Sequence, residues 1–436
     1  MPSPRNVITW IWWSLCLNSM LSMSPRAFAM RVTIKKDYLP SFWFGIQWQS
    51  AGIDSGIGSG IGLTSNATIQ INLTTALPSP NAYVVVFTER QFLSSLRHLL
   101  LQTNEAPSTY LPCEWRASLA QPIDAVHRIR SPESGRYWVG ILQGHAKAVQ
   151  GLSGEVGFLN PNNDELSLPH REVSQTFLWV ARLFLSSAAV LLFLMILHRK
   201  GASRLHFLIL ATLMLKCFVL LLIRQDISIV AKSGRPSLSH QVIVEIVGQI
   251  ESILEVIVFY IIGLGWKITR SHLRPSEWAF ATTIATLSFF LGSFKIACST
   301  FAACTGKSYL LTQFTLHSLC FLVVIVATNF NIFTLQRQIA EALATPDTGK
   351  LYTKHQAYCW FRGFFLFFVI TPSLVNFLAA HVLTWEEYWV VLFVKEFSLW
   401  LVHTAVAFLF RPGNKKLIVF ELAVVESSDS DSTDQE

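Results

Sequence analysis

The sequence predicts a membrane protein with two parts, a luminal or extracellular all-β domain near the N-terminus and a bundle of seven transmembrane helices after it. Hydrophobic residues make up 52% of the 436 residues and charged residues only 14%, whereas about a quarter of a typical soluble chain is charged. Apolar stretches long enough to cross a bilayer recur through the C-terminal part. The segment before them holds only short runs rich in β-branched and aromatic residues.

Residues 1–29 have the pattern of a secretory signal peptide. A basic residue, Arg5, precedes an apolar stretch from Val7 to Met23, and the small residues Ala27 and Ala29 suit cleavage after Ala29. An uncleaved membrane anchor is the alternative. In either case the chain from residue 30 onward enters the secretory lumen.

Residues 30–172 are predicted to form one luminal β-sandwich. About 140 residues can bury a single core, and Ala67–Leu73 alternates apolar and polar side chains as a half-buried strand does. Glu89–Gln102 is expected to form a helix against the sheet, and the Gly-rich stretch 52–62 a loop rather than a phosphate site. The expected strands are Arg31–Ile34, Trp43–Trp48, Ala67–Leu73, Ala82–Thr88, Arg136–Gln143 and Glu155–Leu159.

The same domain contains candidate sites of covalent modification. Asn66 and Asn72 each begin an Asn-x-Thr sequon, which makes them candidate N-glycosylation sites. Cys113 could be a buried free thiol. Alternatively, Cys298 and Cys304 could close a small loop after the fourth span, or one of them could pair with Cys113. The sequence does not choose between these arrangements.

Residues 173–412 are predicted to contain the seven spans. Each stretch holds close to 20 or more mainly apolar residues, enough for about 30 Å of hydrocarbon. The connecting loops are short, so their basic residues can be compared from side to side. The predicted spans cover residues 176–197, 205–224, 241–266, 277–298, 308–334, 358–380 and 388–410.

The charge of the loops predicts the orientation. With the N-terminus in the lumen, the cytoplasmic loops and the start of the tail hold twelve Lys and Arg residues and the luminal loops only three, as the positive-inside rule requires. The C-terminus is then cytoplasmic. Residues 413–436 form an acidic, Ser-rich tail, which is either simply solvated or phosphorylated and read by a sorting adaptor.

Several charged and amide side chains fall inside the predicted spans. Such residues are costly in a membrane and usually face the bundle interior in pairs. Two interpretations stay open: an ionic network that fixes helix registry, or a luminal polar cavity for a ligand, lipid headgroup or ion. A retinal Schiff base at the lysine of the last span is disfavoured, because the next residue is a glutamate that can pair with it. The set comprises Arg182, Lys216, Glu245, Gln249, Glu251, Glu255, Lys295, Lys395 and Glu396.

Short motifs around the spans resemble a known family. Gly157–Pro161, Gly263–Arg270 and Arg274–Trp278, together with the order of parts, are similar to the GOLD-domain seven-transmembrane family, closest to its intimal-thickness-related receptor subgroup with a rhodopsin-like seven-transmembrane domain. His206–Lys216 and Phe410–Pro412 also resemble the lung seven-transmembrane receptors. The resemblance implies a Golgi-dynamics-type luminal sandwich on a seven-helix bundle, and a role in secretory-pathway trafficking or in receptor signalling of the G-protein-coupled type. The acidic-Arg-aromatic and Asn-Pro-x-x-Tyr motifs of rhodopsin-like receptors are absent from the third and seventh spans.

These features favour a non-enzymatic receptor or cargo adaptor of the Golgi, secretory pathway or plasma membrane. Its luminal domain would bind a protein, peptide or lipid, and a G protein or sorting adaptor would read the cytoplasmic side. The alternative is a transporter or cation channel that uses the ionic residues. No catalytic constellation, cofactor motif or metal site stands out. The net charge of +7 comes with no nucleic-acid-binding pattern.

Overall fold

The structure is a computed structural model, and it describes most of the two predicted parts. The signal segment, most of the Gly-rich stretch, most of the predicted helix Glu89–Gln102, Cys304 and the tail lie outside the described residues. Described are residues 31–38, 47–48, 61–63, 66–75, 82–88, 90–91, 94, 113–128, 135–143, 150–161, 168–233, 237–270, 272–301, 308–341, 348–383 and 387–412.

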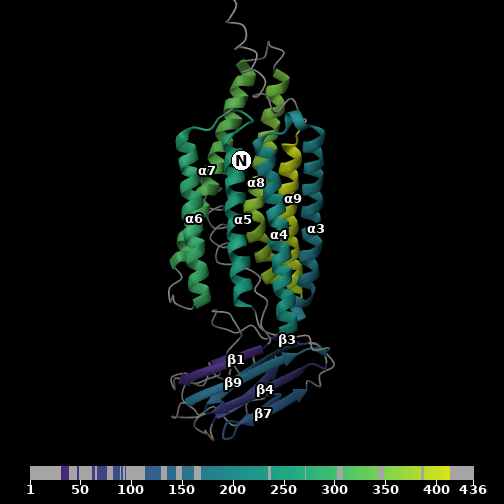
Figure 1. Cartoon of the computed structure of the whole chain (residues 1–436), viewed down its shortest axis with the longest axis vertical. Coiled ribbons are helices and arrows are strands. Elements are labelled where there is room, and N and C mark those ends of the chain that lie inside the picture. The colour runs from purple at the N-terminus through teal and green to yellow at the C-terminus, as the bar shows by residue number, and fades with distance from the viewer. Residues whose placement is uncertain are drawn as a thin grey trace, which may run out of the picture.

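The N-terminal part consists of two antiparallel sheets. The first has the strand order β1-β9-β4-β7 and lies below the helices in Figure 1. The second has the order β2-β8-β5-β6, with β3 also paired to β8. The strands are β1 (Arg31–Tyr38), β2 (Gln47–Trp48), β3 (Ile61–Leu63), β4 (Thr68–Thr75), β5 (Ala82–Thr88), β6 (Trp115–Ser118), β7 (Ile123–Arg128), β8 (Gly135–Gln143) and β9 (Gln150–Leu159).

One hydrophobic cluster joins the two sheets. Ile69 and Ile71 of β4 are fully buried and pack in the same cluster as Val84 and Val86 of β5. The intervening residue of β4, Gln70, is exposed, because successive side chains of a strand point to opposite faces. The alternation seen in the sequence therefore identifies the buried face of β4 correctly.

The sequence missed β3, β6 and β7. The burial of β7 alternates along the strand but its sequence does not, because the apolar Val126 lies on the outward face and is 66% exposed. Strand β6 has half-buried residues and includes Arg116. These strands are defined by pairing with β4, β5 and β8 rather than by an apolar run of their own.

The C-terminal part is a bundle of long helices that run up and down in turn (Figure 1). Six of them are long and apolar enough to cross a membrane, by length and composition. The 27-residue helix α5 is not among the six. The helices are α3 (Leu168–Leu197), α4 (Arg204–Ser233), α5 (Leu238–Leu264), α6 (Pro275–Phe301), α7 (Ser308–Glu341), α8 (Thr348–Val382) and α9 (Tyr388–Leu409).

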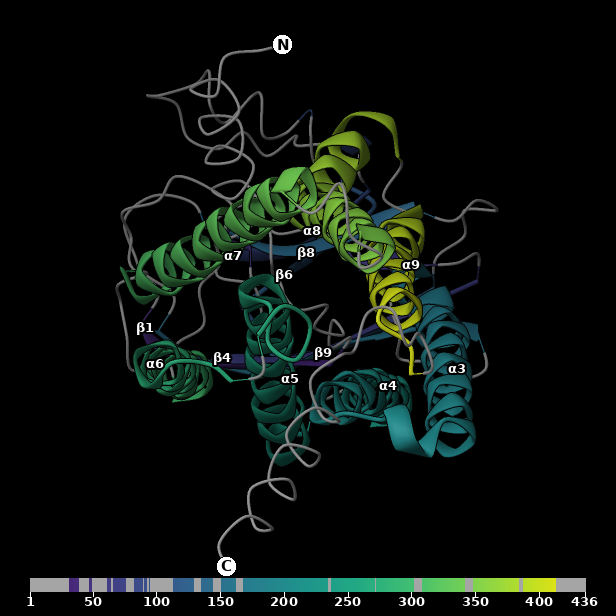
Figure 2. The ribbon, with the colours of Figure 1, turned by 90° about the horizontal axis from the view of Figure 1, so that it is seen from above.

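Most of these helices are longer than the apolar stretches that predicted them. Helix α4 continues to Ser233 rather than ending near residue 224, and α8 begins ten residues before the predicted start at 358. A helix continues wherever its backbone hydrogen bonds can form, so hydrophobicity marks only the part that suits hydrocarbon. Helix α5 lies between α4 and α6 (Figure 2) and also contacts α7.

The β region lies at one end of the bundle, next to the start of α3 (Figure 1), and β3 contacts α3. The ends of α3, α5, α7 and α9 and the starts of α4, α6 and α8 all lie at the opposite end, called here the far end. Basic residues gather at the far end of these helices and in the connections between them. They include Arg199, Arg204, Lys267, Arg270, Arg274, Arg337, Lys350, Lys354 and Arg411.

Candidate functional site

Five charged side chains from three helices meet inside the bundle and are called here the ionic cluster. Lys216 of α4 places its Nζ 3.2 Å from Oε2 of Glu396 on α9 and 3.7 Å from Oε2 of Glu251 on α5. His403 of α9 places its Nε2 3.0 Å from Oε1 of Glu255 on α5. The cluster therefore joins α4, α5 and α9 by ion pairs.

Helical spacing explains how these residues converge. Glu251 and Glu255 are four residues apart on α5, and Glu396 and His403 are seven apart on α9, so each pair lies on one helix face. Lys216 stands near the middle of α4. Lys216, Glu251, Glu255 and His403 are each 9% exposed or less. The cluster is therefore an interior feature of the bundle.

The hydrogen bonds of His403 restrict the protonation of its pair with Glu255. Its Nδ1 lies 2.8 Å from the carbonyl oxygen of Leu399, and a carbonyl only accepts, so Nδ1 carries a proton. A neutral ring would then present an unprotonated Nε2 to the carboxylate, which is a repulsive contact. Either the ring is an imidazolium or Glu255 is protonated, so the pair holds one additional proton.

Among the five side chains of the ionic cluster, three carboxylates face one lysine and one histidine, which leaves one formal negative charge even with an imidazolium. Lys395, the residue before Glu396, interacts electrostatically with Glu396 and offsets this charge. Oε1 of Glu251 is buried and has no hydrogen-bond partner among the described residues. Buried polar atoms are nearly always satisfied. The geometry therefore leaves room for a proton, a water molecule or a cation at Glu251.

Aromatic rings surround the histidine end of the ionic cluster. The ring of His403 lies 6.0 Å from that of Phe184 and 5.7 Å from that of Phe259, measured between centroids. Phe259 in turn contacts Phe365 and Phe368 of α8. This apolar shell lowers the local dielectric constant and strengthens the attraction within the cluster.

The other predicted intramembrane residues make none of these three ion pairs, although Lys395 interacts electrostatically with Glu396 and Lys216. Arg182 is exposed on α3. Glu245, Lys295 and Lys395 are half-buried. Gln249 instead donates from Nε2 to the carbonyl of Ser288 on α6, at 3.0 Å.

Sequence reasoning missed His403 altogether. Histidine is common in helices, and only its position two turns after Glu396 on the same face would have suggested it. By contrast, Lys216, Glu251, Glu255 and Glu396 were all among the predicted residues and are brought together.

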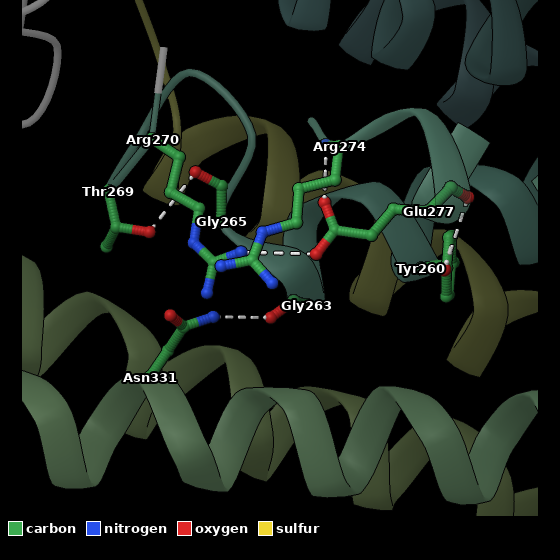
Figure 3. Close-up of polar contacts among 8 residues, drawn as sticks. All are labelled: Tyr260, Gly263, Gly265, Thr269, Arg270, Arg274, Glu277 and Asn331. Carbon is green, nitrogen blue, oxygen red and sulfur yellow. Dashed lines mark hydrogen bonds and ion pairs between the residues drawn. The ribbon is translucent and has the colours of Figure 1, made fainter. Parts of the chain in front are cut away.

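The α5–α6 connection at the far end contains the motif residues Gly263–Arg270 and Arg274–Trp278 (Figure 3). Arg270 places Nη1 3.1 Å from Oε1 of Glu277, and the other carboxylate oxygen of Glu277 accepts the backbone N–H of Arg274 at 2.9 Å. The latter contact caps the start of α6 in the manner of a capping box. Asn331 of α7 donates to the carbonyl of Gly263 at 2.7 Å.

Gly265 ends α5 in a left-handed conformation with φ of 87°. A Cβ there would meet Thr269 and would approach the hydroxyl of Tyr358 to 3.1 Å, so glycine is required for both conformation and space. Tyr358 of α8 donates to the carbonyl of Ile262 at 3.3 Å. The motif residues therefore have a structural role. They close the turn, and hydrogen bonds from Asn331 and Tyr358 attach the end of α5 to α7 and α8.

In the β region, both sequon asparagines are exposed. Asn66 adopts a positive φ of 62° in a turn, and Asn72 lies on the outward face of β4. Cys113 is a free thiol, so the possible disulfide from it is not formed, and burial raises the pKa of that thiol. Cys298 is disulfide-bonded, while Cys304 lies outside the described residues.

Comparisons with known proteins leave the family open. The chain matches no protein-family model, and no curated protein matches it. Among the described residues, no group of three or more His, Cys, Asp or Glu side chains is placed to hold a metal ion. Chemically, the ionic cluster can bind a proton or clamp three helices.

Proposed function

We propose that the chain is a seven-transmembrane receptor or cargo adaptor whose luminal or extracellular β-sandwich binds a ligand and whose helix bundle anchors or transmits that event. The observation that carries this proposal is the position of the β region at one end of the bundle, with the basic connections at the other (Figure 1). In this proposal α5 also crosses the membrane and brings the number of spans from six to seven. Its glutamates are compensated by cationic side chains inside the bundle.

The positive-inside rule supports the orientation. If the basic far end faces the cytoplasm, then the β region, with exposed Asn66 and Asn72, faces the lumen or the cell exterior. The resemblance to the GOLD-domain seven-transmembrane family leads to the same proposal for the sandwich and for trafficking or G-protein-linked signalling.

The ionic cluster gives the bundle a means of responding. Its ion pairs join α5 to α4 and α9, so a shift of one helix would break charge pairs in an apolar interior. Such a contact has few intermediate positions and favours discrete arrangements over gradual deformation. A ligand on the β region would then favour one arrangement by its differential affinity.

Localisation and glycosylation of the full chain test the proposal. The protein with a C-terminal tag is expressed with and without Asn66→Gln and Asn72→Gln, and its mass is compared before and after glycosidase treatment. We expect a loss of mass that both substitutions together abolish. Complex glycans at the cell surface would favour a receptor, and retention in the Golgi would favour a trafficking adaptor. In sealed microsomes, whose cytoplasmic side faces outward, digestion of the tag by externally added protease agrees with a cytoplasmic tail, whereas glycan attachment at the far end would reject the orientation.

A transporter or cation channel is the second candidate, and the unsatisfied Oε1 of Glu251 favours it. Ionisable side chains inside a helix bundle often mark ion and proton pathways. Purified protein in sealed vesicles should then pass protons or monovalent cations, and Glu255→Gln should abolish the flux. Vesicles that remain silent with correctly folded protein would reject this candidate without touching the receptor proposal.

A further inference from the structure

Arg182 is an unusual residue for its position. It lies in the first half of the apolar segment His170–Leu197, yet its side chain is exposed on the outward face of α3. Further along the same helix, Val190 and Phe193 are 60% and 63% exposed, as expected for a surface that contacts lipid. A guanidinium on such a surface is costly unless an anion satisfies it.

The described residues supply no carboxylate for Arg182. Within the described part of the chain, its guanidinium faces the ring of Trp179, whose centroid lies 5.0 Å from Cζ of the arginine. The ring covers one face of the guanidinium by a cation–π interaction, but it accepts none of the five N–H bonds at the edge of the group. The donors therefore need an acceptor from outside the described chain.

The contact with Trp179 also gives the direction of the arginine. Trp179 is three residues nearer the start of α3, and that start adjoins the β region (Figure 1). The guanidinium therefore extends toward that side of the membrane, as long helical side chains do when they lean toward the N-terminus of the helix. Arginine reaches the headgroup level in this way, and tryptophan favours the same level.

We propose that Arg182 and Trp179 form a binding site for the phosphate group of a phospholipid in the leaflet on the β-region side. The guanidinium donates two parallel N–H bonds to the phosphate oxygens, and the indole supports the guanidinium from behind. Gln175, exposed one further turn along this face, adds an amide donor near the glycerol esters. A lipid with an anionic headgroup is preferred, because Arg182 then carries the compensating charge. This site is separate from the ionic cluster and goes beyond the proposed receptor function.

Native mass spectrometry of the purified full-length protein tests the site. The protein is titrated with phosphatidic acid, with phosphatidylcholine and with inorganic phosphate, and the bound lipid is counted. We expect Arg182→Gln to weaken binding of phosphatidic acid by about tenfold or more, as for loss of a charged hydrogen-bond pair. Arg182→Lys should restore part of the affinity, because it keeps the charge but loses the two-pronged geometry.

Arg171→Gln is the matched control, since Arg171 is an exposed arginine of the same helix and carries the same charge. Equal loss in both variants would mean non-specific attraction and would overturn the proposal. Binding of inorganic phosphate as tight as that of phosphatidic acid would also overturn it, because the site would then bind a soluble anion. A dimer that dissociates on Arg182→Gln with lipid binding unchanged would assign the arginine to a helix–helix contact and would also overturn it.

Trp179→Leu supplies a second variant, and we expect it to weaken lipid binding while the thermal unfolding midpoint stays unchanged.

Discussion

Nε2 of His403 lies 3.0 Å from Oε1 of Glu255, and this contact joins α9 to α5 in the interior of the bundle. Because Nδ1 of the same ring donates to the Leu399 carbonyl, a neutral ring would present a bare Nε2 to the carboxylate. A proton must therefore lie between Nε2 and Oε1 of Glu255, on one atom or the other. Together with the two contacts of Lys216, this contact makes the ionic cluster a buried polar connection between α5 and the helices α4 and α9.

Loss of Lys216 should strongly destabilise the bundle. Lys216→Met leaves Glu251 and Glu396 without their cation in an apolar interior, and breaking a buried pair on one side costs about 3–5 kcal/mol. Thermal unfolding of the purified protein measures the effect. Arg337→Gln is the control, because Arg337 and Glu341 form an exposed pair that contributes about 0.5 kcal/mol at most. Equal effects of the two substitutions would contradict a buried cluster.

Glu251 and Glu255 should respond differently to neutralisation. Glu251→Gln removes the more distant of the two carboxylates that face Lys216, and Lys216 keeps the nearer one, Glu396, so we expect a change in unfolding free energy within about 1 kcal/mol of zero. Glu255→Gln removes the partner of His403 and should cost about 1.5–3 kcal/mol, the range for a hydrogen bond to a charged group. Thermal unfolding of both variants in parallel gives the comparison. A larger cost at Glu251 would show that its carboxylate is fully compensated.

Gly265 should tolerate no side chain. Gly265→Ala forces an L-residue into a left-handed conformation, which costs about 1–2 kcal/mol, and the added Cβ meets Thr269 and the hydroxyl of Tyr358. Gly363 of α8 is the control, because a Cβ there meets nothing within 4 Å. Gly363→Ala should be neutral or stabilise the helix by up to about 1 kcal/mol. Thermal unfolding should therefore show a loss of stability for Gly265→Ala and no loss for Gly363→Ala.

Alkylation should distinguish the free thiol of Cys113 from the disulfide-bonded Cys298. Because burial raises the pKa of Cys113, less thiolate is present at neutral pH than for an exposed thiol, and only the thiolate reacts. Alkylation of the folded protein should therefore be slow at neutral pH and accelerate as the pH rises. Mass analysis of unreduced peptides should find Cys113 alkylated and Cys298 in a disulfide. An unreactive Cys113 in denatured, unreduced protein would contradict its free state.

The fold could be predicted from the sequence where one segment carries its own signal. The apolar length of α9 and the alternation around Ile69 and Ile71 are local patterns, and the structure reproduces both of them. Strands β6 and β7 lacked such a signal, since they are held by hydrogen bonds to strands distant in the chain. The six apolar helices therefore confirm the membrane class, while the strand set needed the sheets themselves.

The sequence by itself determined that charges would be buried in the bundle, because Lys216, Glu251 and Glu396 occur within apolar stretches. Only the tertiary structure decided which of them meet. His403 joins the ionic cluster and Arg182 does not, although each lies in an apolar helix. The physical reason is that helical periodicity fixes the face on which a residue lies relative to its own helix. Which face turns inward depends on the rotation of each helix against its neighbours, and that rotation follows from the packing of the whole bundle.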